Sequence, residues 1–310
     1  MSNVLNSYRF SMLALLCAPL LMGGACEKKG TKPGNDTGAI GAADRADDST
    51  GPADESPLPN IDVSKLSKDK QKLFYKLLAS FNSPCGKAHS LRTSYTTDNS
   101  CKRAPFAVRY LATMLEEEAT EDTVREFWNG KYASKNPTGI KIDVANAPHE
   151  GNVDAPVKIY EFYDYACPHC AAFKKQMDEV LAEESGKVVT FFLQYPLEGK
   201  HPDSRSAAQA ALAANAQGKF KEMHDLLFEK SPAHQHDAVV EYAKTLGLDA
   251  AKFEADYTAM STQVTRDEKT GEGLGVDSTP TVFFNDRKYE GPMLAKYVKL
   301  WIDEELAVNR

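Results

Sequence analysis

The sequence predicts an α/β domain preceded by a small all-helical module, and three patterns lead to this fold class. A β-branched and aromatic run at residues 157–164 indicates a strand, and apolar residues at helical spacing follow it between residues 171 and 181. A second such run, residues 281–284, comes directly after Pro280. Residues 61–135 show only helical spacing, so we expect them to form a separate helical module.

Length and composition limit the classes of protein to consider. At roughly 150 residues per domain, a chain of 310 residues has room for about two domains. With 42% hydrophobic and 26% charged residues, wholesale disorder and a polytopic membrane protein are both poor fits. The 37 basic residues are outnumbered by 44 acidic ones, which argues against a nucleic-acid partner.

The first 25 residues have the features of an export signal. Arg9 is their one charge, and the apolar run at 10–22 is too short to span a bilayer. Small residues then lead to Cys26, and this arrangement resembles the lipobox of bacterial lipoproteins, in which the Cys becomes the lipidated first residue. Gly23 stands where that family usually has Leu, so ordinary cleavage near Ala25 remains the alternative. Both interpretations place the mature chain outside the cytoplasm.

Residues 26–60 have the composition of a disordered tether. From residue 27 onward this stretch holds five Gly, four Pro and no aromatic residue, so it cannot bury enough apolar surface to become ordered. A flexible chain of this length spans roughly 30 Å. It could hold a domain away from a membrane or serve only as a spacer.

The helical module at 61–135 contains its own pair of cysteines. Its first two expected helices have apolar faces, and Thr120 is expected to cap a third helix. The apolar residues are Leu66, Phe74, Leu77, Leu78 and Phe81 in the first helix, and Ala107, Tyr110, Leu111, Met114 and Leu115 in the second. Cys85 and Cys101 frame a polar connection, and we expect a structural disulfide there, with a redox relay or metal binding as alternatives.

Part of this module resembles a known redox family. Residues 119–132 are similar to the helical hairpin of cytochrome c maturation thiol reductases. That family carries its cysteines in a CxxC motif, which is missing here, so the resemblance brings no redox activity with it.

The residues that point most specifically to chemistry are Cys167-Pro168-His169-Cys170, between the expected strand and helix. A cysteine at a helix start meets unpaired N–H groups and the positive end of the helix dipole, which favour the thiolate. The second cysteine, one turn later, can resolve a mixed disulfide. Ala171 stands where c-type haem attachment needs His, a zinc site needs about two further ligands, and an inert structural motif is the remaining alternative.

Together with the segment that ends in Pro280, this motif resembles the thioredoxin superfamily, and more closely the DsbA-like thiol–disulfide oxidoreductases. The resemblance covers about residues 140–308 and implies a thioredoxin-like fold with a helical insertion at about 202–270. Glu161 occupies the place of the family's buried carboxylate, and Pro280 that of its cis proline. Thr279 departs from the Val that usually precedes that proline, so the direction of the reaction is left open.

The resemblance assigns a role to each site residue. Cys167 is expected to be the exposed nucleophile, Cys170 the resolving thiol and Glu161 a proton carrier for it, while His169 could donate to the Cys167 thiolate. Thr279 and Pro280 would bind substrate. The full set of expected catalytic and substrate-binding residues is Glu161, Cys167, Pro168, His169, Cys170, Thr279 and Pro280. Neither an organic cofactor nor a metal is expected.

The sequence therefore predicts an exported enzyme, lipid-anchored at the periplasmic face of the cell envelope, that oxidises the thiols of other proteins. Its expected partners are protein substrates with thiols or disulfides, a membrane or soluble redox partner, and the membrane itself. A reductase or isomerase, for example in cytochrome c maturation, is one alternative. A redox-inert tethered binding or chaperone module is another.

Overall fold

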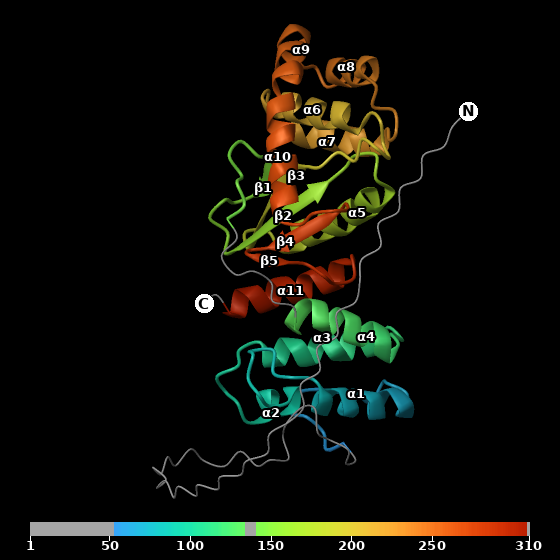
Figure 1. Ribbon diagram of the computed structural model, residues 1–310, viewed down its shortest axis with the longest axis vertical. Coiled ribbons are helices and arrows are strands. Elements are labelled where there is room, and N and C mark those ends of the chain that lie inside the picture. The colour runs from blue at the N-terminus through green and yellow to red at the C-terminus, as the bar shows by residue number, and fades with distance from the viewer. Residues whose placement is uncertain (1–52, 134–140, 309–310) are drawn as a thin grey trace, which may run out of the picture. The chain divides into compact units, whose positions relative to one another are not determined.

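The computed structural model describes residues 53–133 and 141–308 (Figure 1). The predicted signal peptide, the lipidation site Cys26 and the tether up to residue 52 lie outside the described residues. Within the described ranges, no helix has both the length and the apolar character needed to cross a membrane.

The first described range is helical, as predicted. Its elements are α1 (Lys68–Ser80), α2 (Leu91–Thr96), α3 (Ala104–Glu116), α4 (Glu121–Trp128) and the π-helical turn η1 (Asn129–Ala133). All ten apolar residues expected on the faces of the two longer helices are buried. The Thr120 hydroxyl accepts the N–H of Thr123 at 3.2 Å, so the predicted cap of α4 is present.

Two local features of this module differ from the expectation. Residues 53–60, expected as the end of the tether, pack on the module: Leu58 is buried, and Tyr95 donates a hydrogen bond to the carbonyl of Pro59. The polar connection between the cysteines contains the short helix α2, because the Ser90 side chain accepts the N–H of Thr93 and caps its start. A polar sequence can form a helix when such a cap satisfies its first N–H groups.

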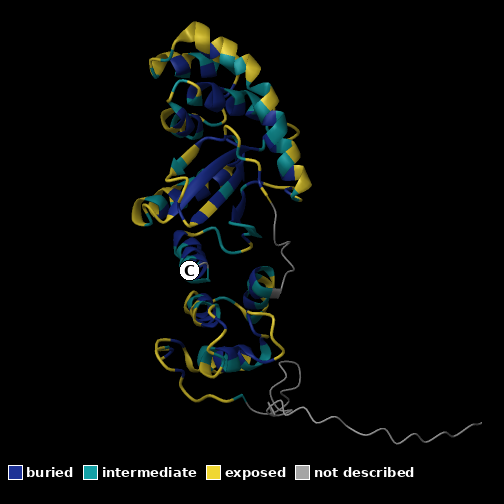
Figure 2. Cartoon of the chain, turned by 90° about the vertical axis from the view of Figure 1, so that its left-hand side faces the viewer, coloured by how far each residue is buried: buried dark blue, intermediate teal, exposed yellow. Residues whose placement is uncertain are grey.

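The second described range contains a mixed five-stranded sheet. Its strands are β1 (His149–Gly151), β2 (Val157–Tyr163), β3 (Val188–Gln194), β4 (Thr281–Phe284) and β5 (Arg287–Lys288). The order is β1-β3-β2-β4-β5; β2 and β3 are parallel, and the other neighbouring pairs are antiparallel. Every residue of β3 is buried, and most of the central part of the sheet is coloured as buried in Figure 2.

Helices lie on both faces of the sheet, and the cysteine motif lies after β2, at the start of the first of these helices. The helices are α5 (Pro168–Glu183), α6 (Ser204–Asn215), α7 (Phe220–Glu229), α8 (His236–Thr245), α9 (Ala250–Ala259), α10 (Ser261–Gly273) and α11 (Ala295–Val308). Helices α5 and α11 pack on Val157, Ile159 and Val282. Helices α6–α10 form the predicted helical insertion between β3 and β4, and α6 and α7 pack against Tyr163 and Phe192.

A buried cluster of charges joins the helical module to α11. Lys131 of η1 lies 3.0 Å from Glu304 of α11, and both side chains are at most 1% exposed. Arg103 at the start of α3 and Arg287 of β5 also pair with Glu304. Tyr297 of α11 completes the apolar core of the module. Helix α11 therefore contributes to the cores of both parts.

Candidate redox site

The Cys167–Cys170 motif lies at the start of α5, as the sequence predicts. Cys167 occupies the N-cap with extended backbone, and Pro168 fills the first helical position, where its missing N–H costs nothing. The N–H of Cys167 donates to the carbonyl of Asp164 at 3.1 Å, which closes the turn between β2 and the helix. Both cysteines are free thiols in this structure.

The two cysteines have opposite environments. The pKa of Cys167 is lowered to about 5, mainly by a hydrogen bond from Cys170, then by Thr279 and by the backbone N–H groups of Cys170 and His169. Burial raises the pKa of Cys170 far above that of a free thiol. Cys167 is 5% exposed and Cys170 is 0% exposed. Cys167 is therefore the more accessible of the two cysteines, but it is more buried than the prediction of an exposed nucleophile.

Thr279 and Pro280 face this pair from the loop before β4. The peptide bond between them is cis. The Cys167 sulfur lies 3.4 Å from the Thr279 carbonyl oxygen, which ties the two loops together. The Thr279 hydroxyl is buried and has no ordinary hydrogen-bond partner within the described ranges, and it lowers the pKa of both cysteines.

His169 and Pro168 are both exposed at the helix start. The backbone N–H of His169 stabilises the Cys167 thiolate, whereas the sequence predicted the imidazole of His169 as the donor. The reason is geometric: the N–H groups in the first helical turn point toward the N-cap residue, whereas an exposed side chain points to solvent.

Glu161 lies in the central strand β2, between Phe192 of β3 and Val282 of β4. Burial raises its pKa to about 8, so the carboxyl is protonated at neutral pH. It lines a small cavity together with Lys174 and Met177 of α5, the helix that carries Cys170. The carboxyl thus lies beneath the helix of the cysteine pair.

Sequence reasoning missed several polar residues around the site. Asp164, three residues before Cys167, is buried and holds His201 at 2.8 Å. The Tyr165 hydroxyl bonds to Tyr163 at 2.8 Å and to His224 of α7 at 3.0 Å. The signal that could have indicated Asp164 is its place as a charged residue between the strand and the cysteine motif; His201 and His224 come from distant segments.

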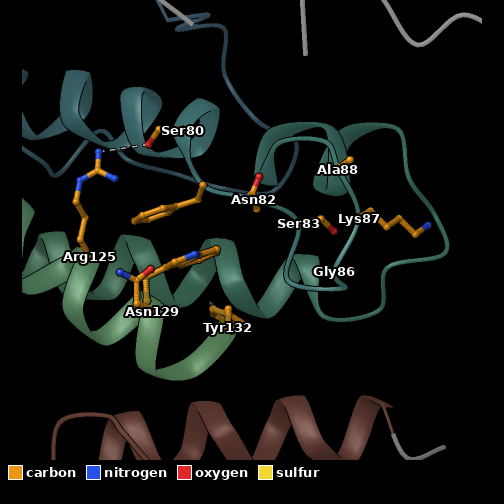
Figure 3. Close-up of a pocket in the computed structure, with 11 residues that line it drawn as sticks. Ser80, Asn82, Ser83, Gly86, Lys87, Ala88, Arg125, Asn129 and Tyr132 are labelled. Carbon is orange, nitrogen blue, oxygen red and sulfur yellow. Dashed lines mark hydrogen bonds between the residues drawn. The ribbon is translucent and has the colours of Figure 1, made fainter. Parts of the chain in front are cut away.

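The second cysteine pair belongs to a different region. Cys85 and Cys101 form a disulfide with a Cα–Cα distance of 5.8 Å. Beside it is a cavity of about 520 Å³, in which Arg125, Asn129 and Tyr132 face Ser80 and the loop after α1 (Figure 3). None of the described residues that line this cavity belongs to the predicted redox site.

The described residues contain no group of three or more His, Cys, Asp or Glu side chains arranged to hold a metal ion. The groups at the site are the sulfurs of Cys167 and Cys170 and the Thr279 hydroxyl, and the Glu161 carboxyl lies beneath the helix that carries Cys170.

Sodium/proton antiporters match about half of this chain. The chain is 36% identical over 150 residues to the Na(+)/H(+) antiporter NhaA 1 of Mycobacterium sp. (strain KMS), a match that covers 46% of this chain and 24% of the antiporter. It is 30% identical over 164 residues to the Na(+)/H(+) antiporter NhaA of Herminiimonas arsenicoxydans, covering 52% of this chain and 25% of that protein. The chain thus spans about a quarter of the length of these antiporters.

Two solved structures resemble about half of this chain. Oxidised BdbD from Bacillus subtilis is 26% identical with a TM-score of 0.48, over 54% of this chain and 96% of that one. A thioredoxin-like oxidoreductase from Silicibacter pomeroyi DSS-3 is 28% identical with a TM-score of 0.47, over 51% and 91%. The family model described as thioredoxin matches residues 143–304, just over half of the chain. The chain belongs to the thioredoxin family.

Proposed function

We propose that this protein is a DsbA-like thiol–disulfide oxidoreductase that oxidises the thiols of other proteins. The observation that carries the proposal is the contrast between the two cysteines at the start of α5. Cys167 is stabilised as a thiolate, whereas burial keeps Cys170 a thiol. A stable nucleophilic thiolate and a buried resolving thiol are what repeated disulfide exchange requires.

The reaction starts from the Cys167–Cys170 disulfide. A substrate thiolate attacks the Cys167 sulfur, so a substrate–Cys167 bond forms and the Cys167–Cys170 bond breaks. Cys170 leaves with the electron pair and takes up a proton. A second substrate thiolate then attacks the substrate sulfur of the mixed disulfide and releases Cys167 as a thiolate. The substrate loses two electrons and the enzyme gains two, while one of the two substrate protons goes to Cys170 and the other to solvent.

Glu161 is the proposed proton carrier for Cys170. A carboxyl whose pKa is raised to about 8 can exist in either protonation state near neutral pH. Its cavity is also lined by Lys174 and Asp178 of α5, whose side chains are 15% and 46% exposed.

The oxidising direction is supported by the low pKa of Cys167. A thiolate that is stable in the reduced enzyme makes the disulfide form easier to reduce, and hence a stronger oxidant. The Thr279 hydroxyl favours the same thiolate. Reduction or isomerisation would use the same steps in reverse and is the second candidate, since Thr279 replaces the Val usual in oxidases of this kind.

The protein is proposed to act outside the cytoplasm on the periplasmic face of the envelope, anchored by lipid at Cys26 and recharged by a membrane or soluble redox partner. The support is the sequence of residues 1–60. Labelling with radioactive palmitate tests the anchor: a Cys26→Ala variant should lose the label.

The equilibrium between the Cys167–Cys170 pair and glutathione tests the proposed function. The full-length protein is equilibrated in buffers of varied glutathione ratio, and the fraction of reduced Cys167–Cys170 is measured by alkylation and mass spectrometry. We expect disulfide exchange at an oxidising potential and formation of disulfides in reduced, unfolded ribonuclease A. With oxidised glutathione present as the oxidant, Cys170→Ser should accumulate mixed disulfides with that substrate, and Cys167→Ser should not. Ribonuclease oxidation that survives in Cys167→Ser would contradict the proposal and favour the redox-inert module.

A further inference from the structure

We propose that Asp164 is a positioning residue of the redox site, whose buried carboxylate holds the loop after β3 against the turn that presents Cys167. The proposal rests on the redox function proposed above and adds to it a residue outside the cysteine motif and the cis-proline loop.

The Asp164 carboxylate is fully buried, and both of its oxygen atoms make hydrogen bonds. Its side chain is 0% exposed. Its Oδ1 atom accepts the N–H of Ala166 at 2.8 Å, within the turn that leads to Cys167. Its Oδ2 atom accepts the N–H of Leu197 and bonds to Nδ1 of His201, both at 2.8 Å. One carboxylate therefore joins the cysteine turn to the loop between β3 and α6.

The backbone of Asp164 acts on the cysteines directly. Its carbonyl accepts the N–H of Cys167 at 3.1 Å. A backbone hydrogen bond from Asp164 to the Cys170 sulfur opposes the effect of burial on that thiol. Any rotation of Asp164 therefore moves groups that touch both reactive cysteines.

The loop after β3 continues the connection to the segment that carries Thr279. The N–H of Tyr195 donates to the carbonyl of Tyr163 at 2.9 Å, and its hydroxyl donates to the carbonyl of Val276 at 2.7 Å. The Tyr195 ring also packs directly on α10 at Gly271, where a Cβ atom would lie 2.7 Å from the ring. Asp164 and Tyr195 thus fix the same loop between the cysteine turn and the cis-proline segment.

Replacing the carboxylate with an amide separates positioning from charge. In Asp164→Asn, the side chain keeps its size, but its NH₂ group cannot accept, so the N–H of either Ala166 or Leu197 loses its acceptor. Loss of a nearby negative charge alone would favour the Cys167 thiolate and lower the pKa of Cys167. Loosening of the turn would move the N–H groups away from the sulfur and raise that pKa. The two effects have opposite signs.

The experiment titrates the Cys167 thiolate by its ultraviolet absorbance in wild-type protein, Asp164→Asn and the matched control Glu198→Gln. Glu198 is a half-exposed carboxylate on the same loop, paired with Arg205. We expect the Cys167 pKa to rise by at least about one unit in Asp164→Asn, and the glutathione equilibrium to shift about tenfold toward the enzyme disulfide. Glu198→Gln should match the wild type.

A fall of the Cys167 pKa in Asp164→Asn would overturn the proposal in favour of a charge effect. An unchanged pKa with a lowered melting temperature would overturn it in favour of a purely structural role. If Asp164→Asn does not fold, His201→Gln tests the proposal instead, because it removes one partner of the carboxylate at a partly exposed position. The pKa of Cys167 should then rise by at least about 0.3 units, or twofold. No change in that pKa would overturn the proposal. A wild-type protein that does not exchange with glutathione contradicts the proposed function, whereas the thiolate titration does not depend on exchange.

Discussion

The sulfur of Cys167 lies 3.4 Å from the carbonyl oxygen of Thr279, the residue before the cis proline. The carbonyl can accept only from the protonated thiol, whereas the Thr279 hydroxyl can donate to the thiolate. Because the hydroxyl is buried and without another ordinary partner in the described part of the chain, it is free to turn toward the sulfur. The segment before β4 thus supplies hydrogen-bonding groups for both forms of the nucleophile.

Replacing Thr279 with Val should therefore raise the pKa of Cys167 from about 5. We expect a rise of about one unit, since one hydrogen bond to a charged group is lost while the shape of the side chain is kept. Thiolate absorbance against pH measures the change. Thr190→Val is the matched control, because Thr190 is a fully buried threonine of the same sheet, in β3. Equal titration curves for Thr279→Val and the wild type would exclude a role for the hydroxyl.

Glu161 should make the stability of the reduced protein depend on pH. Its pKa is about 8 in the folded state, against an ordinary value of 4.5. A raised folded pKa stabilises the protein below the unfolded pKa, and this contribution is lost as the pH rises from about 4.5 through 8. Glu161→Gln has no such titration, so its free energy of unfolding relative to the wild type should increase by at least about 1 kcal/mol between pH 5 and pH 8.

Urea unfolding of the reduced proteins at the two pH values measures this difference. Glu183→Gln, an exposed carboxylate at the end of α5, serves as the control and should follow the wild type at both values. If Glu161→Gln and the wild type lose stability in parallel, the carboxyl is ionised in the folded protein and cannot act as the proposed proton carrier.

Local patterns predicted the fold and the centre of the site. Strand alternation, helical spacing and the Thr120 cap depend on neighbouring residues, so one sequence is enough to find them. The Cys167–Cys170 motif is equally local, and the structure places it where the pattern predicts, at a helix start. The second described range has the predicted α/β fold with a helical insertion.

Contacts between distant segments could not be predicted in this way. Asp164 and His201 are 37 positions apart, and Lys131 and Glu304 meet across most of the chain. A charged residue in a single sequence suggests a solvated position, because burial without a partner is costly. The partner is known only once the fold is known. For the same reason, the packing of residues 53–60 on the helical module could not be read from their polar composition.

The buried charge cluster should be sensitive to the loss of Glu304. Although burial alone would raise the pKa of Glu304, Lys131, Arg103 and Arg287 hold it below its ordinary value. Glu304→Gln removes the carboxylate that pairs with buried Lys131 and one of the carboxylates that pair with Arg103 and Arg287, and should lower the free energy of unfolding by about 3–5 kcal/mol. Asp303→Asn is the neighbouring control: its carboxylate is 41% exposed and pairs with Arg109 at 3.7 Å, so a loss of at most about 1 kcal/mol is expected. Equal effects of the two substitutions would show that the cluster is not closed to water.

The Cys85–Cys101 disulfide should stabilise the helical module without taking part in catalysis. It closes a loop with a sequence separation of 16, and the chain-entropy model gives a contribution of roughly 3 kcal/mol for such a loop. A double variant with Ala at both positions should therefore unfold at a lower urea concentration, while the glutathione equilibrium of Cys167 and Cys170 stays unchanged. Mass spectrometry across a dithiothreitol titration gives the potential at which each pair opens. If the Cys85–Cys101 bond opens together with the Cys167–Cys170 bond, and its removal stops turnover without lowering stability, the pair is a redox relay instead. The structure favours the stabilising role because Cys101 is buried at the start of α3, where reduction would release the loop that contains α2 from the helix it packs against.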